Sequence, residues 1–542
     1  MNTTMKPELK KPSCAIEHTD VDRTTAKRGA GFRRNDPNTR SPTSGTRNKN
    51  EEKPVRLRAL SFRTYHQRPC HLFLLFVLLL GNGLTRCYGL KPSIPSFLPN
   101  KPFVVFWNAP TIRCESVYGV PLNLNAFSIV HNTQEKFIGE NITIFYYDQL
   151  GLYPYYMNST VINGGCPQNA SLKSHLDQMV VDIKTAMPQP FLGLAVIDWE
   201  EWRPQWVRNW DKKSIYRVMS QQLVRNKNPF WTADQIDKQA QWEFETATQI
   251  FMTRTMKQAQ FQQPAGHWGY YLYPECYNYD YQNNFDNFTG HCPHIEVQRN
   301  NQLQWLWEAS KALYPSIYMQ EVLKNSNQGK KFVKAKVIEA MRIAELPSSV
   351  CSLPVYVYSR PFYSYSLTPL TQVDLISTIG QTAALGAQGV VLWGDVDYSR
   401  NQSNCLIVQK YLKTTLGPYI INVTTAAKLC SQFICNNHGR CLRKNPDLDT
   451  YLHLNSDSFK IQVAQMDSRS YVSVRGSMNQ YQKEKMKEEF TCHCYEGWTG
   501  DNCQSKAGTE CKSFSKGLRL AWQWDWCMVT AISCGLLFLG QL

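Results

Sequence analysis

Apolar runs of strand length alternate with amphipathic helical patterns between residues 100 and 420. Short runs rich in β-branched and aromatic residues indicate buried strands, whereas apolar positions that recur every three to four residues indicate helices. We expect strands at 103–107, 142–147, 193–198, 268–273, 315–319, 354–358 and 389–393. We expect helices near 171–186, 213–226, 233–259, 301–313, 331–345, 371–386 and 403–415.

This alternation is typical of a parallel sheet, because parallel strands need long crossover connections that are usually helical. The length of the pattern and the acidic residues at strand ends favour a β/α barrel with its functional site at the carboxyl ends of the strands. Thr232 followed by Gln235 predicts a capping box at the start of the long helix. The sequence therefore predicts an α/β fold.

One strand ends in a pair of acids. The apolar run 194–197 leads into Asp198, Trp199, Glu200 and Glu201, and Pro204 breaks the pattern. Side chains two positions apart on a strand share a face, so we expect Asp198 and Glu200 side by side at the mouth of the barrel. Two close carboxyl groups do not both ionise readily, and one of them then keeps the proton that a glycosidase donates. The alternative is a strand end with two solvated acids, and alternation gives Glu201 a structural or outward role.

Residues 430–503 carry a cysteine pattern typical of an epidermal-growth-factor-like (EGF-like) module, with a long insert at 442–491. The chain has 18 cysteines, many in close clusters, which together with glycosylation sequons indicates an oxidising, secretory environment. The expected glycosylation sites are Asn141, Asn158, Asn169, Asn287, Asn401 and Asn422.

The net charge of +16 is spread unevenly, because residues 1–70 hold 16 Lys and Arg against 7 Asp and Glu. That segment cannot bury a core, and we expect a disordered basic extension or an unused upstream start. A basic tail can bind nucleic acid, but this one precedes a secretory signal, so no nucleic-acid partner is expected. The milder basic balance of the remainder fits attraction to a polyanion as well as an ordinary basic surface.

Both ends of the chain carry targeting patterns. The short apolar core 72–80 predicts a signal peptide at 71–89 with cleavage after Gly89, the alternative being an uncleaved signal anchor. Within 506–542, small residues precede a spacer and a final apolar tail, which is the pattern of a glycosylphosphatidylinositol (GPI) anchor signal. We expect Ser515 as the attachment site and a cell-surface location, with secretion as the alternative.

The acidic run lies among other motifs in a fixed order. They are Phe106–Pro110, Gly151–Tyr156, Trp268–Pro274, Ala312–Tyr318 and Gly389–Gly394. Together they resemble the animal and insect-venom hyaluronidases, glycoside hydrolase family 56, and the C-terminal pattern resembles the membrane-bound, sperm-surface branch. The resemblance covers roughly residues 90–505 and implies a distorted TIM-like (β/α) barrel at 90–425 followed by the EGF-like module at 426–505.

The resemblance also implies endo-hydrolysis of β-1,4 bonds after N-acetylhexosamine in hyaluronan, with chondroitin as a possible further substrate, by a substrate-assisted retaining mechanism. Glu200 would be the proton donor, Asp198 would share its proton and hold the acetamido group, and Tyr318 would hydrogen-bond the acetamido oxygen. Tyr271 and Trp393 would wall the pocket, although such aromatic residues otherwise fill a barrel core. We expect three arginines to meet substrate carboxylates along a groove, since a guanidinium binds a carboxylate bidentately. These are Arg203, Arg208 and Arg360.

The resemblance implies five disulfides: Cys114–Cys405, Cys276–Cys292, Cys430–Cys441, Cys435–Cys492 and Cys494–Cys503. Two further cysteines of the barrel, Cys166 and Cys351, lie outside this scheme, and a pairing between them is one possibility. Two positions depart from the family, because many members carry Asp where this chain has Ser364 and Glu275. The acid lost at Ser364 is expected to shift the pH optimum, the substrate preference or the rate. Glu275 keeps the charge on an arm that is longer by one methylene, and activity is still expected.

Two other functions stay open at this stage. One is a hydrolase that prefers chondroitin sulfate, and the other is a surface glycan-binding or adhesion protein with little catalysis. No metal-binding or phosphate-binding motif stands out, and no cofactor is expected.

Overall fold

The computed structural model describes residues 90–158, 160–466 and 469–507. The predicted basic extension, the signal peptide and Ser515 lie outside the described residues. Within these described ranges, no helix combines the length and the apolar character needed to cross a bilayer.

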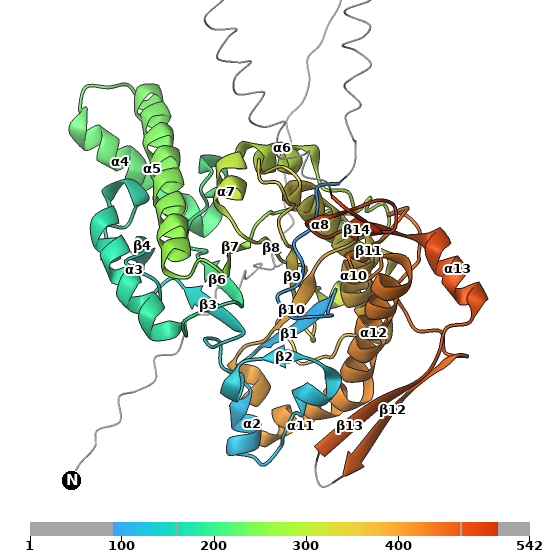
Figure 1. Cartoon of the computed structure of the whole chain (residues 1–542). Coiled ribbons are helices and arrows are strands. Elements are labelled where there is room, and N and C mark those ends of the chain that lie inside the picture. Colours follow the sequence, from blue (N-terminus) through green and yellow to red (C-terminus); the bar gives the residue numbers. More distant parts are fainter. Residues whose placement is uncertain (1–89, 159, 467–468, 508–542) are drawn as a thin grey trace, which may run out of the picture. The chain divides into compact units, whose positions relative to one another are not determined.

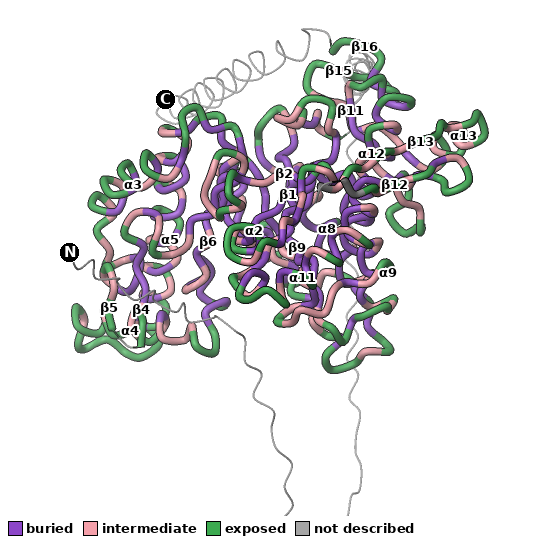
Figure 2. The backbone as a smooth tube through the Cα atoms, turned by 90° about the horizontal axis from the view of Figure 1, so that it is seen from below, coloured by how far each residue is buried: buried purple, intermediate pink, exposed green. Residues whose placement is uncertain are grey.

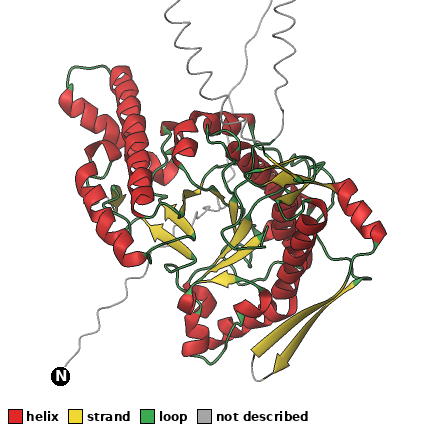
Figure 3. Ribbon diagram, in the orientation of Figure 1, coloured by secondary structure: helices red, strands yellow, loops and turns green. Residues whose placement is uncertain are grey.

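Two four-stranded parallel sheets, in the orders β2-β1-β10-β9 and β3-β6-β7-β8, form the centre of the molecule (Figure 1). Helices surround these strands, as expected for a β/α barrel (Figure 3). The strands are β1 (Val104–Asn108), β2 (Val130–His131), β3 (Ile142–Tyr146), β6 (Leu194–Asp198), β7 (His267–Leu272), β8 (Tyr314–Pro315), β9 (Tyr356–Ser359) and β10 (Gly389–Trp393). Each predicted strand has a counterpart, and the short β2 was not expected.

The two sheets are joined differently at their two seams. Between β8 and β9, Leu313 and Ser316 bridge to Val355 and Tyr358 in parallel register. The strand predicted at 315–319 is shortened to β8, because Pro315 has no N–H to donate to a neighbouring strand.

At the other seam, the fully buried side chain of Asn132 replaces the missing strand pairing between β2 and β3. Its Nδ2 donates to the carbonyls of Lys136 and Ile142 at 2.7 and 2.6 Å. Its Oδ1 accepts from the backbone N–H groups of Asn141 and Ile142, both at 3.0 Å. One carboxamide therefore closes the barrel where two strands diverge.

The helices are α2 (Ile112–Ser116), α3 (Leu172–Ala186), α4 (Ser214–Lys227), α5 (Ala233–Gln262), α6 (His294–Gln302), α7 (Gln304–Ala309), α8 (Asn327–Ala344), α9 (Gln372–Leu375), α10 (Gln381–Ala384), α11 (Gln402–Tyr411), α12 (Gly417–Ile434) and α13 (Gln480–Glu489). The capping box of Thr232 and Gln235 is present at the start of α5. The helix predicted at 301–313 is wrong in its bounds, because the chain leaves helical geometry at Leu303 and divides α6 from α7.

Helix α12 was not predicted, because Gly417 and Pro418 resemble a helix stop. This pair lies at the first turn of α12, which is a position at which helices accept proline. Two π-helical turns, Ile376–Gly380 and Leu412–Leu416, connect α9 to α10 and α11 to α12. The long helical path therefore continues to Ile434.

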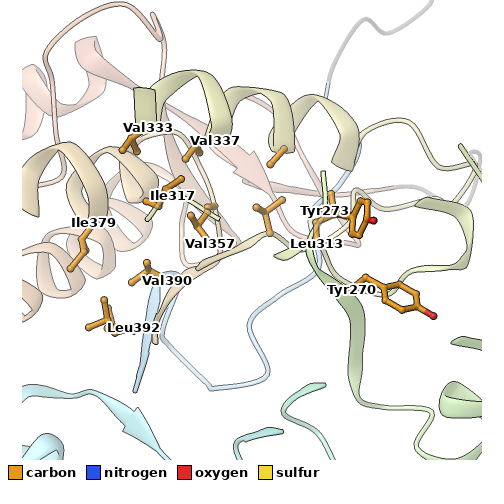
Figure 4. Packing of buried hydrophobic residues seen from close by; sticks show 14 of the residues in the cluster. Tyr270, Tyr273, Leu313, Ile317, Val333, Val337, Val357, Ile379, Val390 and Leu392 are labelled. Carbon is orange, nitrogen blue, oxygen red and sulfur yellow. The ribbon is translucent and has the colours of Figure 1, made fainter. Parts of the chain in front are cut away.

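The strand side chains divide the core into two layers. Alternate residues such as Phe106, Ile144 and Val196 fill the barrel interior. Strand residues that alternate with such inward positions, for example Val357 and Val390, belong to the larger outer cluster and face helices such as α8 (Figure 4). Both layers are buried along the strands (Figure 2).

The C-terminal part is built on the antiparallel pair β11 (Gly439–Arg443) and β14 (Phe490–Cys494). The long insert forms α13 and a ribbon of β12 (Phe459–Met466) and β13 (Arg469–Gly476). Smaller two-stranded pairs are β15 (Trp498–Thr499) with β16 (Ser505–Lys506), and β4 (Tyr155–Met157) with β5 (Thr160–Ile162).

Disulfides link the five cysteine pairs that the family resemblance implies. The expected pairing of Cys166 with Cys351 is wrong, because both thiols are free. Cys166 is buried beside the hydroxyl groups of Tyr156 and Ser220, at 3.6 and 3.8 Å from its Sγ.

The N-terminal strap, residues 91–98, lies between the barrel and the C-terminal module. Ser93 forms parallel bridges to Ser352, just before β9, and to Tyr495 of the module. The Ser93 N–H donates to the Cys494 carbonyl at 2.8 Å, and the Ser352 N–H donates to the Pro92 carbonyl at 2.9 Å. Since Ser352 precedes its strand, this junction is at the amino-terminal base of the barrel.

Replacing Asn132 with Ala should lower the free energy of unfolding by about 3 kcal/mol, because buried backbone groups at the β2–β3 seam lose their partners. Chemical denaturation with the disulfides intact measures this. The matched variant Asn226→Ala changes an exposed residue of α4 and should differ little from wild type. Equal stability of the two variants would contradict the role given to Asn132.

Candidate active site

The carboxyl end of β6 places an acid on the inner face of the barrel. Leu194 and Val196 belong to the interior cluster, so the alternation continues inward to Asp198. Asp198 is in register with Tyr146 of β3 on one side, and by continuation of the β6–β7 register it lies beside Tyr271. Glu200 follows two residues later, so the predicted acid pair lies at the mouth between tyrosines.

The opposite sheet supplies the aromatic wall. Trp393 ends β10 and follows Val391 of the interior cluster. Its Nε1 donates to the Tyr146 hydroxyl at 3.0 Å, which joins the two sheets across the mouth. The Tyr318 ring stacks 5.9 Å from Trp393 at 22°, and the Tyr271 ring lies 6.2 Å from Tyr318. The structure therefore brings together all the predicted pocket residues.

Sequence reasoning missed Tyr146. The signal was present, because Ile142, Ile144 and Tyr146 alternate along β3 in the same way as the β6 residues that lead to Asp198. Tyr358 of β9 was also missed, and its ring lies 5.0 Å from Tyr271. Both tyrosines extend the aromatic lining around the acids.

The tyrosines of the pocket remain protonated hydrogen-bond donors. Burial raises the pKa of Tyr146 and Tyr271, and the negative charges of Asp198 and Glu200 raise both further. Burial also raises the pKa of Tyr318, with Tyr271 as the next contributor. A phenol with a raised pKa is neutral throughout the range in which a carboxyl group titrates. The pocket can therefore donate a hydrogen bond to an oxygen that gains negative charge.

Glu200 is partly exposed while its surroundings are fixed. Its side chain is 39% exposed, and its Oε2 lies 3.2 Å from Nη2 of Arg203. The Glu200 carbonyl accepts hydrogen bonds from Arg203 Nη1 at 2.9 Å and from Lys213 Nζ at 2.6 Å. Two cations thus hold the loop that presents the acid, while the carboxyl group keeps access to a ligand.

Arg203 begins a series of ion pairs that we call the ion-pair chain. Its Nε lies 3.2 Å from Glu275, and Glu275 lies 2.9 Å from Arg208. Arg208 also pairs with Glu296, which pairs with Arg299 at 2.6 Å. Burial alone would raise the pKa of Glu275, but Arg203 and Arg208 hold it below its ordinary value. Glu275, one of the departures from the family, therefore stays charged and supports the arginine beside Glu200.

The three predicted groove arginines are engaged by carboxylates of the protein itself. Arg203 and Arg208 have side chains only 10% and 9% exposed. Arg360 is 5% exposed, lies over the Trp393 ring at 5.1 Å and pairs with Asp395 at 3.1 Å. A buried cation needs such a partner, so these arginines position Glu200 and Trp393 instead of facing an open groove.

Glu201 and the remaining departure, Ser364, lie at the edges of the site. Glu201 is half-buried, and burial raises its pKa while Lys213 opposes this rise. It faces the side of Tyr153 and Tyr216, whose pKa values its charge raises, and so has the structural role expected from alternation. The N–H of Ser364 donates to the Met319 carbonyl at 2.8 Å, next to Tyr318.

Substituting Glu275 by Gln should lower the free energy of unfolding by about 3 kcal/mol at neutral pH, because Arg203 and Arg208 lose a buried partner. Since the pKa of Glu275 is lowered in the folded protein, its charge stabilises the fold above the ordinary value of 4.5. This contribution disappears as the pH falls through the lowered pKa. Denaturation curves across this range measure the difference.

The conservative variant Glu275→Asp keeps the charge and should retain most of the stability at neutral pH. A difference between wild type and Glu275→Gln that does not shrink on acidification would show that charge pairing is not its cause.

Comparisons with known proteins agree with this geometry. A family model described as hyaluronidase, Glyco_hydro_56, matches residues 92–507. Hyaluronidase-2 of Rattus norvegicus is 46% identical over 417 residues, which cover 77% of this chain and 88% of the rat protein. A hyaluronidase of Crotalus adamanteus is 47% identical over 408 residues, covering 75% of this chain and 91% of the snake protein.

A solved structure shares the fold. The crystal structure of bee venom hyaluronidase in complex with a hyaluronic acid tetramer matches with a TM-score of 0.54 and 33% identity. The match covers 59% of this chain and 98% of the bee protein. With the β/α barrel, the paired acids and the matched family model, the chain belongs to the hyaluronidase family of glycoside hydrolases, family 56.

Proposed function

We propose that this enzyme hydrolyses the β-1,4 bond after N-acetylhexosamine in hyaluronan by a substrate-assisted, retaining mechanism. The observation that carries the proposal is the placement of Asp198 and Glu200 beside a pocket of protonated phenols and Trp393. The bee venom relative solved with a hyaluronic acid tetramer supports the choice of polymer.

In the first step, the acetamido oxygen of the substrate attacks the anomeric carbon while Glu200 donates its proton to the glycosidic oxygen. The glycosidic bond breaks, the leaving sugar departs as an alcohol, and an oxazolinium ring forms within the substrate. Asp198 accepts a hydrogen bond from the acetamido N–H, and the Tyr318 hydroxyl donates a hydrogen bond to the acetamido oxygen. Aromatic walls formed by Tyr271 and Trp393 hold the methyl group and exclude water.

In the second step, Glu200 accepts a proton from water, and the water oxygen attacks the same anomeric carbon. The oxazolinium ring opens and regenerates the acetamido group. Two displacements at one carbon retain its configuration, and Glu200 is again protonated for the next cycle.

Glu200→Gln should lower kcat on hyaluronan by about 10³-fold, which lies within the usual effect of a general acid, while the polymer still binds. Reducing-end release from hyaluronan, chondroitin and chondroitin sulfate measures cleavage and also ranks the substrates. The matched control is Glu201→Gln, which neutralises the adjacent acid and should keep activity within a few-fold.

Two results would contradict the proposal. One is undiminished cleavage by Glu200→Gln. The other is a folded, disulfide-intact wild type that cleaves none of the polymers, which would favour a glycan-binding protein. Faster cleavage of chondroitin or its sulfate would instead assign the enzyme to those polymers.

We also propose that the enzyme passes through the secretory pathway and is held at the cell surface by a lipid anchor at Ser515. Disulfides such as Cys114–Cys405 fit an oxidising compartment. Four of the expected glycosylation sites are exposed, and they are Asn158, Asn169, Asn287 and Asn401. Asn141 and Asn422 are partly buried, and the Asn422 Oδ1 accepts from the Leu454 N–H at 2.9 Å.

Animal cells that express the full chain should lose surface enzyme when treated with phosphatidylinositol-specific phospholipase C, since this enzyme cuts GPI anchors. Ser515→Leu should reduce surface display, because the attachment site needs a small residue. Ser513→Leu is the control at a neighbouring serine. Surface enzyme that resists the lipase in both wild type and variants would contradict anchoring through a lipid.

A further inference from the structure

Two aromatic side chains lie exposed beside the active site, and we call them the aromatic rim. Trp210 is 48% exposed and Tyr277 is 42% exposed. Their ring centroids are 6.0 Å apart and their planes are nearly perpendicular, at 88°. Large apolar rings that stay in solvent next to a functional site often mark a binding surface.

Both rim residues lie in segments that follow barrel strands. Trp210 follows β6 and Tyr277 follows β7, so the chain carries both away from the carboxyl ends of the strands. This is the end of a β/α barrel at which ligands bind. The rim therefore lies on the same side of the barrel as Glu200.

Fixed contacts tie the rim to the catalytic acid. Lys213, in the turn that follows Trp210, donates to the Glu200 carbonyl at 2.6 Å. Arg208 of the ion-pair chain lies 6.0 Å from the centre of the Tyr277 ring. Through Glu275 and Arg203 the same chain reaches the Glu200 carboxylate. The distance between rim and acid is thus set by paired charges and not by a loose loop.

The rim is also supported from behind. The Tyr279 ring packs 4.7 Å from Tyr277 at 62°. Lys336 of α8 in turn lies 4.9 Å from the Tyr279 ring, and its Nζ donates to the Cys276 carbonyl at 2.8 Å. A ring that is held before binding loses little conformational freedom when a ligand stacks on it.

Glu200 has two groups of neighbouring residues. On one side are Asp198 and the pocket of Tyr271, Tyr318 and Trp393, which under the proposed function hold the sugar that keeps its anomeric carbon. On the other side, Arg203 leads through the ion-pair chain to the rim. Because the proton of Glu200 goes to the oxygen between two sugars, a surface reached through Arg203 and not through this pocket is suited to the departing sugar.

Resting on the proposed function, we propose that Trp210 and Tyr277 bind sugar rings of the glycosaminoglycan on the leaving-group side of the cleaved bond. The apolar faces of sugar rings suit aromatic surfaces. Lys212 is exposed and lies two positions after Trp210 in the chain. It belongs to none of the ion pairs among the described residues, so it can meet a substrate carboxylate. The occupant is thus a longer stretch of the same polyanion.

The test uses the full chain, with Trp210→Ala, Tyr277→Ala and the double variant. The double variant should lose about fivefold to tenfold in kcat/KM on polymeric hyaluronan, mostly through KM, as expected for lost aromatic contacts. On an octasaccharide labelled at its reducing end, the position of the cut should shift, because the leaving-group portion is no longer bound. Trp210→Phe and Tyr277→Phe keep a ring and should restore the wild-type pattern.

The matched control is Tyr481→Ala, which removes a more exposed ring from α13, 74% exposed. Unchanged kcat/KM in the double variant, or a uniform loss with the same cutting pattern, would overturn the proposal. The binding of a hyaluronan decasaccharide to Glu200→Gln, with and without Trp210→Ala, separates the two proposals. Weaker binding in the doubly substituted protein supports the rim even if the wild type cleaves a different polymer, whereas equal binding refutes it.

Discussion

Closure of the parallel strands around one interior is the constraint on which the site depends. Each strand turns alternate side chains inward, so the last inward position of every strand lies in one layer at the mouth. Asp198, Tyr146 and Trp393 occupy such positions on three strands. The hydrogen bond between Trp393 and Tyr146 crosses between the sheets, so the layer exists only when both sheets are in register. The arrangement of these residues at the mouth therefore follows from the closure of the barrel.

The ion-pair chain shows how a barrel mouth tolerates charge. Taking arginine and glutamate out of water costs free energy, and pairing mainly offsets that cost without adding stability. The pairing here orients Arg203. Its guanidinium has partners on both sides, Glu200 and Glu275, and both define its position. The glutamate that departs from the family pattern reaches both arginines, so its longer arm is compatible with the same arrangement.

Much of the fold and of the pocket could be predicted from the sequence, because strand alternation and ordered motifs both leave a trace there. The alternation that leads to Asp198 and Glu200 is local, and so is the capping box at Thr232. The seam at Asn132 could not be predicted, since nothing in the sequence pattern shows that this carboxamide bonds the backbone of Lys136, Asn141 and Ile142. The internal pairing of Arg360 also escaped prediction, because nothing in its neighbouring residues shows that Asp395 and Trp393 fold over it.

The N-terminal strap has a consequence for the order in which the molecule is completed. His493, near the end of the described chain, bonds the Lys91 carbonyl at 2.7 Å across 402 positions of sequence. The strap, which is made early, thus acquires its partners in the module only when the last described residues have been made. During synthesis, the strap can pair with Ser352 before the module is made, and its other side is covered only when Tyr495 has followed. Any processing that trims the chain beyond Leu90 would remove residues of this strap.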